Sequence, residues 1–143
     1  SKKVAVELGY DRVLNSIDQF RSRLVKTKQA TDLFGREVNF KLKAVLGNIE
    51  QTFDGKPLYP SIEEKAAHLL YFVIKDHPFA DGNKRIGSLL FLLFLVENRH
   101  VHNKKGGRII TDNALTALAL LIAESRPEQK AVMVALVVNI LKK

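Results

Sequence analysis

Residues 63–98 read EEKAAHLLYFVIKDHPFADGNKRIGSLLFLLFLVEN. Two strongly apolar stretches in this sequence flank a polar segment, HPFADGNKR at residues 77–85, which we call the motif segment. Apolar residues of the first stretch recur at helical spacing, and the apolar run at residues 86–96 is too short to span a bilayer. We therefore expect two buried helices joined by a polar loop, which is a typical place for a functional site on a rigid scaffold.

Outside this region, most of the chain also favours helices. Ser61 followed three residues later by Glu64 forms a capping box that predicts a helix over residues 61–75. Pro127 suits the first turn of a last helix, because its missing N–H would have no partner there. This last helix is expected over residues 127–143. The other expected helices span residues 10–26, 37–46, 82–98 and 111–123.

A β-hairpin is expected at residues 48–60. Asp54-Gly55 is a favoured two-residue turn, because glycine accepts the positive φ that such a turn requires. Pro57 has no N–H to donate, so its strand should be an edge with limited pairing. The fold class is therefore mainly α, a helical bundle with a small β-hairpin.

Composition excludes several classes of protein. The chain has 143 residues, enough for one domain with its own core. It has no cysteine, which excludes a disulfide scaffold, a thiol nucleophile and a zinc–thiolate site. Its 23 basic and 15 acidic residues give a net charge of +8, which at first suggests an anionic partner such as nucleic acid.

The excess positive charge lies at the two ends of the chain. Residues 1–43 carry ten basic and five acidic side chains, and residues 99–143 carry eight and three. Residues 44–98, which contain the motif segment, carry five basic and seven acidic side chains. The chemistry of the motif segment is therefore not a consequence of the basic total.

The motif segment combines residue types suited to phosphate chemistry. His77 is a candidate general base at neutral pH, and Asp81 offers oxygen ligands suited to Mg²⁺ with phosphates. Gly82 and the residues after it would present free N–H groups at a helix N-terminus, which binds anions. Lys84 and Arg85 place cations in the first helical turn, where they oppose the helix dipole. An anionic ligand would resolve this conflict, so the pattern indicates phosphate binding.

The motif segment resembles the signature of the Fic/Doc family, H-P-F-x-(D/E)-G-N-G-R-x-x-R. The matching positions are His77, Pro78, Phe79, Asp81, Gly82, Asn83 and Arg85. From about residue 44 to 143 the chain also resembles the Fic-type C-terminal part of longer bacterial, RhuM-like virulence-associated proteins. The resemblance implies one Fic-like domain over residues 1–143, with an N-terminal helical extension at 1–43 and a core with flap and motif at 44–143.

The family implies transfer of a nucleotide fragment, usually AMP from Mg·ATP, to a protein hydroxyl (AMPylation), so the implied cofactors are ATP and Mg²⁺. On this resemblance His77 takes the proton from a Ser, Thr or Tyr hydroxyl of the target protein, and Asp81 holds Mg²⁺. Phe79 anchors the loop in the core. The implied nucleotide-binding residues are Phe79, Gly82, Asn83, Lys84 and Arg85. The hairpin would be a flap that holds a target segment by strand addition, through Ile49, Glu50, Gln51, Thr52 and Phe53.

Two positions depart from the family pattern. Lys84 stands where the pattern has glycine, and Ser88 stands where it has a second arginine. Asn-Lys-Arg resembles the Doc branch, whose toxin transfers the terminal phosphate, although Doc-type sequences tend to carry alanine in place of Gly82. Alternatives to AMP transfer are therefore a Doc-like protein kinase toxin and a catalytically degenerate module that binds nucleotide or nucleic acid. Lys84 is either a phosphate contact or a solvated surface charge.

The remaining expectations concern partners and location. No glutamate follows a serine or threonine by four residues, so the inhibitory (S/T)-x-x-x-E pattern of the family is absent from this sequence. We expect inhibition from a separate inhibitor or antitoxin, from another part of a longer protein, or not at all. No signal peptide or membrane-spanning run is visible, so we expect a cytoplasmic protein without a membrane partner. No helix-turn-helix signature or aromatic stacking platform supports a nucleic-acid partner, and the sequence does not indicate the oligomeric state.

Overall fold

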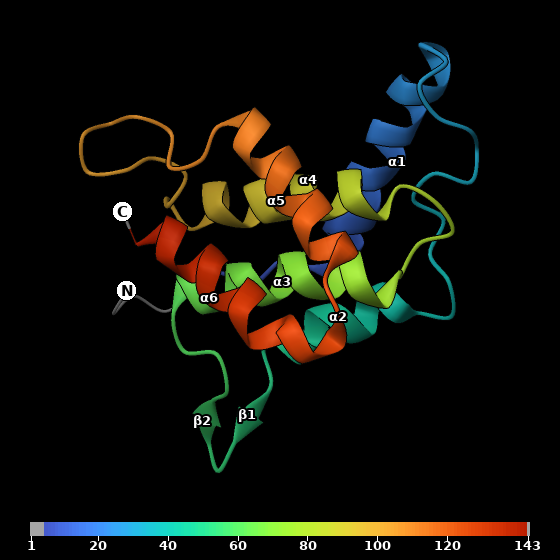
Figure 1. The fold of residues 1–143 in the computed structure, drawn as a ribbon. Helices are drawn as coiled ribbons and strands as arrows, with labels where there is room; N and C mark the ends of the chain where they lie inside the picture. Colours follow the sequence, from blue (N-terminus) through green and yellow to red (C-terminus); the bar gives the residue numbers. More distant parts are fainter. Residues whose placement is uncertain (1–4, 143) are drawn as a thin grey trace.

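The computed structural model describes residues 5–142, and six α-helices dominate that part of the chain (Figure 1). The helices are α1 (Tyr10–Lys26), α2 (Lys41–Ile49), α3 (Ile62–Asp76), α4 (Asn83–Glu97), α5 (Asp112–Glu124) and α6 (Lys130–Leu141). A short 3-10 helix, η1 (Pro127–Gln129), leads into α6. Strands β1 (Thr52–Phe53) and β2 (Lys56–Pro57) form an antiparallel hairpin. The expected mainly α class with a small hairpin is confirmed.

Helix α3 is the centre of the fold. It crosses the middle of Figure 1, and α2, α4, α5 and α6 all pack against it. The largest fully buried side chains of α3 and α4 form one core, made of Leu69, Leu70, Ile74, Ile86, Leu90, Phe91, Phe94 and Leu95. Because both helices that flank the motif segment are buried in this core, the two ends of the loop between them are fixed in space.

The second helix begins later than the sequence predicts. It starts at Lys41 rather than at residue 37, because residues 34–38 do not adopt helical structure. This stretch, which we call the pairing segment, forms isolated β-bridges with residues 79 and 81 of the motif segment. Asn39 and Phe40 then take positive φ angles of 49° and 56°, which turn the chain into α2.

The hairpin is shorter than the expected span of residues 48–60. The strands pair Thr52 with Pro57 and Phe53 with Lys56, and one further bond runs from the Leu58 N–H to the Gln51 carbonyl (3.0 Å). Residue 49 belongs to α2. The turn itself is as expected, because Asp54-Gly55 has φ angles of 55° and 77°. The last helix also differs, since its first turn is the 3-10 helix η1, and Lys143 lies outside the described residues.

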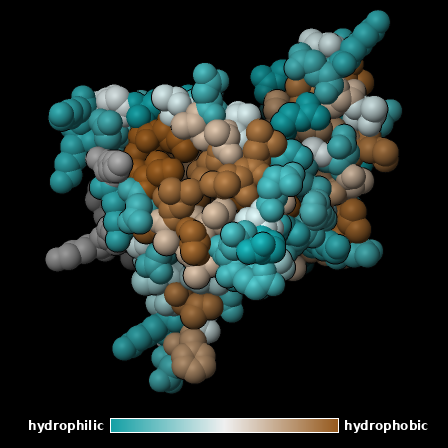
Figure 2. All heavy atoms as spheres, in the orientation of Figure 1, coloured by the Kyte–Doolittle hydropathy of each residue, from teal (hydrophilic) through white to brown (hydrophobic). Residues whose placement is uncertain are grey.

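Apolar side chains also reach one face of the molecule. Figure 2 shows them across the centre of this face and at the tip of the hairpin. The exposed ones on α5 and α6 are Leu120, Leu121, Val132 and Leu136, and Phe53 of the hairpin is 78% exposed. Despite this apolar surface, no helix within residues 5–142 has the length and apolar character needed to cross a membrane.

Ser61 caps the N-terminus of α3, because its hydroxyl accepts a hydrogen bond from the Glu64 N–H (3.0 Å). We expect Ser61→Ala to lower the free energy of unfolding by about 1 kcal/mol, measured by urea denaturation. Ser22→Ala is the matched control, because Ser22 is exposed on α1. An equal loss of stability in the control would contradict the role of the cap.

Candidate active site

The motif loop, residues 77–82, connects the C-terminus of α3 to the N-terminus of α4. Its first and last residues both have left-handed backbone angles, with φ 50° and ψ 61° at His77 and φ 86° and ψ 18° at Gly82. This conformation is natural for glycine and uncommon for other residues. These two left-handed residues let the chain reverse direction between the buried helices, while the His77 side chain stays exposed.

The pairing segment holds the motif loop through main-chain hydrogen bonds. The two stretches are far apart in the sequence and lie side by side in the fold. The bonds run from the Gly35 N–H to the Asp81 carbonyl (3.0 Å), from the Val38 N–H to the Pro78 carbonyl (2.9 Å) and from the Ala80 N–H to the Arg36 carbonyl (2.8 Å). The loop is therefore built as part of a small strand pairing and not as a free connection.

Asn83 closes the other side of the loop. Its side-chain oxygen accepts from the Phe79 N–H (3.0 Å), and its side-chain N–H₂ donates to the Phe79 carbonyl (2.9 Å). The Phe79 ring is 2% exposed and belongs to the core. Phe79 therefore anchors the loop, as expected. The Asn83 amide holds the loop through both bonds to Phe79. Its implied role in nucleotide binding stays a prediction.

A polar cavity of about 390 Å³ opens beside the motif loop. It brings together six of the predicted site residues, namely His77, Asp81, Gly82, Asn83, Lys84 and Arg85. Ile74, Ala80 and Ala123 complete its wall. Phe79 is not part of this wall, because its ring points into the core, so the structure does not place it among groups that can touch a ligand in the cavity.

The N-terminus of α4 carries two cations and lacks a side-chain cap. No acidic residue lies in the first turn of α4, and the N-cap Gly82 has no side chain to accept from the free N–H groups. Lys84 is exposed, and the structure gives it no ion pair within residues 5–142. The Arg85 guanidinium donates to the Gln29 carbonyl (3.0 Å) and lies 4.6 Å from the centre of the Phe34 ring. This end of the cavity is suited to an anion.

A family model described as Fic/DOC family matches residues 10–95, which contain the whole motif segment. The chain belongs to the Fic/DOC family. Membership indicates a Fic-type transferase in general terms. No curated protein and no solved structure matches the chain.

The range that matches the Fic/DOC family extends from α1 to most of α4. It begins within residues 1–43, which we expected to form an extension of the domain, and it includes the pairing segment. Helices α5 and α6 lie beyond the matched range, although α5 contributes Ala123 to the wall of the cavity. The boundary at residue 44 stays a prediction.

Asp81 is the residue of this Fic/DOC chain best suited to a metal. It is the one carboxylate among the residues that line the cavity. Across residues 5–142, no group of three or more histidine or acidic side chains is placed to hold a metal ion. A single carboxylate fits Mg²⁺, which usually keeps several waters and binds through one or two carboxylates together with substrate phosphates. The donor set therefore suits Mg²⁺ that arrives with a nucleotide.

Asp76 is a second carboxyl group close to His77 in the sequence. Partial burial raises the pKa of its carboxyl, while the charges of Lys130, Lys41 and His77 act in the opposite direction. Asp76 does not line the cavity. Asp81 therefore remains the carboxylate that can meet a ligand there.

The predicted flap residues 49–53 lie at the other end of α3 from the motif loop (Figure 1). The hairpin leads into the N-terminus of α3, whose 15 residues span about 22 Å, and the motif loop follows its C-terminus. Ile49 is buried at the end of α2, and the Glu50 carboxylate pairs with the Lys65 ammonium group (2.8 Å). Gln51, Thr52 and Phe53 are exposed. The structure does not bring these residues to the cavity, and the pairing segment lies beside the motif loop instead.

Two residues that hold the site were missed from the sequence. Residues 32–35 lie between the two helices expected over 10–26 and 37–46, and the sequence assigned them no role, yet Phe34 is fully buried against Gly82. Arg21 was also overlooked, although it is 8% exposed. The signal for Arg21 was present, because it follows Ile17 by four residues on the apolar face of α1.

Gly82 is required by its φ angle and by the Phe34 ring, because a Cβ built on Gly82 would lie 2.3 Å from a carbon of that ring. Alanine, which Doc-type sequences tend to carry here, therefore has no room in this chain. We expect Gly82→Ala to lower the free energy of unfolding by about 2 kcal/mol or more, measured by urea denaturation.

The matched control for this prediction is Gly47→Ala. Gly47 lies within α2, its φ is not positive, and an added Cβ would meet no atom within 4 Å. This variant should be neutral or stabilising by up to about 1 kcal/mol, because alanine favours helix more than glycine. A Gly82→Ala protein as stable as Gly47→Ala would show that the close contact with Phe34 is unimportant.

Proposed function

We propose that this chain is a nucleotide-dependent transferase that moves AMP from Mg·ATP to a hydroxyl group of a target protein. One observation carries the proposal, which is that His77, Asp81 and the cationic N-terminus of α4 line the same cavity. A general base, a magnesium ligand and an anion-binding helix end are the three elements that this reaction needs. Membership of the Fic/DOC family supports the same conclusion.

The proposed reaction assigns a role to each group in the cavity. The target hydroxyl attacks the α-phosphorus of ATP, His77 accepts the hydroxyl proton, and pyrophosphate leaves. Asp81 holds Mg²⁺, which supplies positive charge to the phosphates. The N–H groups at the start of α4, together with Lys84 and Arg85, stabilise the negative charge of the phosphates. Asn83 contributes by fixing the loop through Phe79.

Phosphate transfer is the second candidate, and the surroundings of Ser88 favour it. Ser88 occupies the place of the second arginine and lines a separate, mostly apolar cavity of about 390 Å³ between α1, α4 and α5. Lys84 and Arg85 border both cavities. Helix α4 therefore offers no second guanidinium to the terminal phosphate. Without it, the terminal phosphate lacks the contact that would hold it in the orientation of AMP-transferring relatives. This absence favours the Doc-like transfer of the terminal phosphate.

We propose that the pairing segment, and not the hairpin, binds the target main chain. The Glu37 main-chain N–H and carbonyl have no hydrogen-bond partner within residues 5–142, although their neighbours pair with the motif loop. A free main-chain edge beside a reactive group can accept an extended peptide as an added strand, independent of its sequence. This edge would bring a target hydroxyl to the side of the motif loop that carries His77.

Regulation by a separate protein, an inhibitor or antitoxin, is part of the proposal. The family's inhibitory glutamate pattern is absent from this sequence, so a carboxylate that blocks the cationic end of the cavity would come from elsewhere. We propose the cytoplasm as the place of action, where Mg·ATP and target proteins are both available.

The transferred group can be identified with labelled ATP. The protein is incubated with a bacterial lysate, Mg²⁺ and ATP labelled on either the α- or the γ-phosphate, and label on protein is measured. AMP transfer predicts retention of the α label alone, because the γ-phosphate leaves with pyrophosphate. Retention of the γ label alone would establish phosphate transfer instead. Absence of both labels would contradict transfer to a protein of that lysate.

His77→Ala should lower the transfer of label at least about 100-fold, because the variant loses the general base. His102→Ala is the matched control, since His102 is exposed in the loop between α4 and α5 and does not line the cavity. The control should keep the wild-type rate. Full transfer by His77→Ala would remove His77 from the mechanism.

A further inference from the structure

The Phe34 ring is the contact point of three parts of the molecule. It is fully buried, and the Phe20 ring of α1 packs edge-on against it at 5.4 Å between centroids. Its carbons also fill the space where a Cβ of Gly82 would be. On its face lies the Arg85 guanidinium, 4.6 Å from the ring centre. One side chain therefore contacts both the N-cap of α4 and a cation of the candidate anion site.

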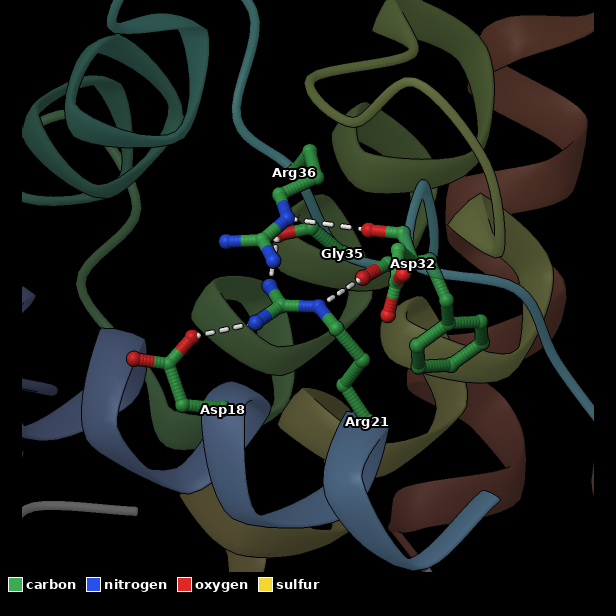
Figure 3. A network of polar contacts seen from close by, with 6 residues as sticks. Asp18, Arg21, Asp32, Gly35 and Arg36 are labelled. Carbon is green, nitrogen blue, oxygen red and sulfur yellow. Dashed lines mark hydrogen bonds and ion pairs between the residues drawn. The ribbon is translucent and has the colours of Figure 1, made fainter. Parts of the chain in front are cut away.

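Arg21 fixes the main chain that carries this ring (Figure 3). Its guanidinium donates through Nε to the Phe34 carbonyl and through Nη2 to the Gly35 carbonyl (3.0 Å). A third donor, Nη1, pairs with the Asp18 carboxylate at 2.6 Å. A planar fork that holds two successive carbonyls restrains their orientation more tightly than a single bond does.

We propose that Arg21 and Phe34 are positioning residues that set the Arg85 guanidinium and the N-terminus of α4 for an anionic ligand. The identity of that ligand, a phosphate chain, rests on the proposed function. Neither residue touches the ligand in this proposal. Arg21 orients the main chain at Phe34 and Gly35, and the Phe34 ring then packs against the Arg85 guanidinium.

Holding Arg85 in place before a ligand binds reduces the entropy lost on binding. An exposed arginine has many rotamers, and holding it at a phosphate costs conformational entropy on binding. Here the Phe34 ring and the Gln29 carbonyl hold the guanidinium before any ligand arrives. A pre-positioned cation binds an anion more tightly than a mobile one, because this entropy is lost on folding and not on binding.

A purely structural role for Phe34 makes a different prediction from a positioning role. If Phe34 only fills the core, its replacement weakens ligand binding whether or not Arg85 is present. If it acts through Arg85, its replacement has no further effect once Arg85 is removed. A double-mutant cycle separates the two cases, because coupled residues give non-additive effects.

The first experiment examines the free protein and is independent of any activity. In a protein labelled with ¹³C and ¹⁵N, the Arg85 side-chain resonances should be shifted upfield by the ring current of Phe34. Phe34→Leu should abolish the shift, and Arg21→Lys, which cannot form the same fork, should reduce it. Arg36→Gln is the matched control, because the Arg36 side chain donates to the Asp32 carbonyl in the same region (Figure 3). Absence of the upfield shift in the wild-type protein would overturn the proposal.

The second experiment measures binding of inorganic triphosphate with Mg²⁺ by calorimetry. We expect Phe34→Leu to weaken binding about two- to fivefold, in line with the strength of an exposed cation–π contact. In the Arg85→Ala background the same replacement should cause no further loss. Equal losses in both backgrounds would overturn the proposal. Failure of the wild-type protein to bind triphosphate would count against the proposed function, while the resonance shift would still decide the role of Phe34.

Discussion

The main-chain pairing between residues 34–38 and the motif loop is the constraint on which the rest of the site depends. Three hydrogen bonds join the loop to a segment from a distant part of the sequence. On the opposite side, the Asn83 side chain satisfies both main-chain groups of Phe79, as a neighbouring strand would. Main-chain groups away from water need hydrogen-bond partners, and here the pairing segment and the Asn83 side chain supply them along the middle of the loop. The loop is therefore rigid enough to keep His77 and the start of α4 in one orientation.

The charged groups at the candidate site come from a part of the chain that does not share its positive net charge. The whole surplus of +8 comes from the flanking thirds, and the third that contains the motif segment is slightly acidic. Within that third, the helix end, Lys84 and Arg85 face the same cavity as Asp81. An uncapped helix N-terminus with two cations in its first turn is electrostatically unfavourable without an anion. The basic total first suggested nucleic acid, whereas the arrangement of these groups favours a small phosphorylated ligand bound with a metal.

Much of the fold could be predicted from periodicity and capping. The bounds of α1, the cap at Ser61 and the Asp54-Gly55 turn depend on residues close together in sequence, so local patterns were sufficient. The prediction that a helix begins at residue 37 was wrong, because contacts with a distant segment decide the structure there. A helical apolar pattern adjoins residues 34–38. The main chain of these residues nevertheless pairs with the motif loop, which is distant in the sequence. Tertiary hydrogen bonding outweighed local propensity there.

The sequence alone determined which residue types could perform the proposed chemistry, because the motif segment is continuous and carries the proposed base, the proposed metal ligand and two cations within residues 77–85. The tertiary structure decided which of them face the cavity. It turned Phe79 into the core, engaged the Asn83 amide with the loop and placed the hairpin at the far end of α3. It also brought the Phe34 ring against the Arg85 guanidinium and the Arg21 guanidinium to the Phe34 carbonyl. These outcomes depend on contacts between distant segments. The spacing of Arg21 on the apolar face of α1 indicates its burial, but no pattern of neighbouring residues indicates which distant groups it contacts.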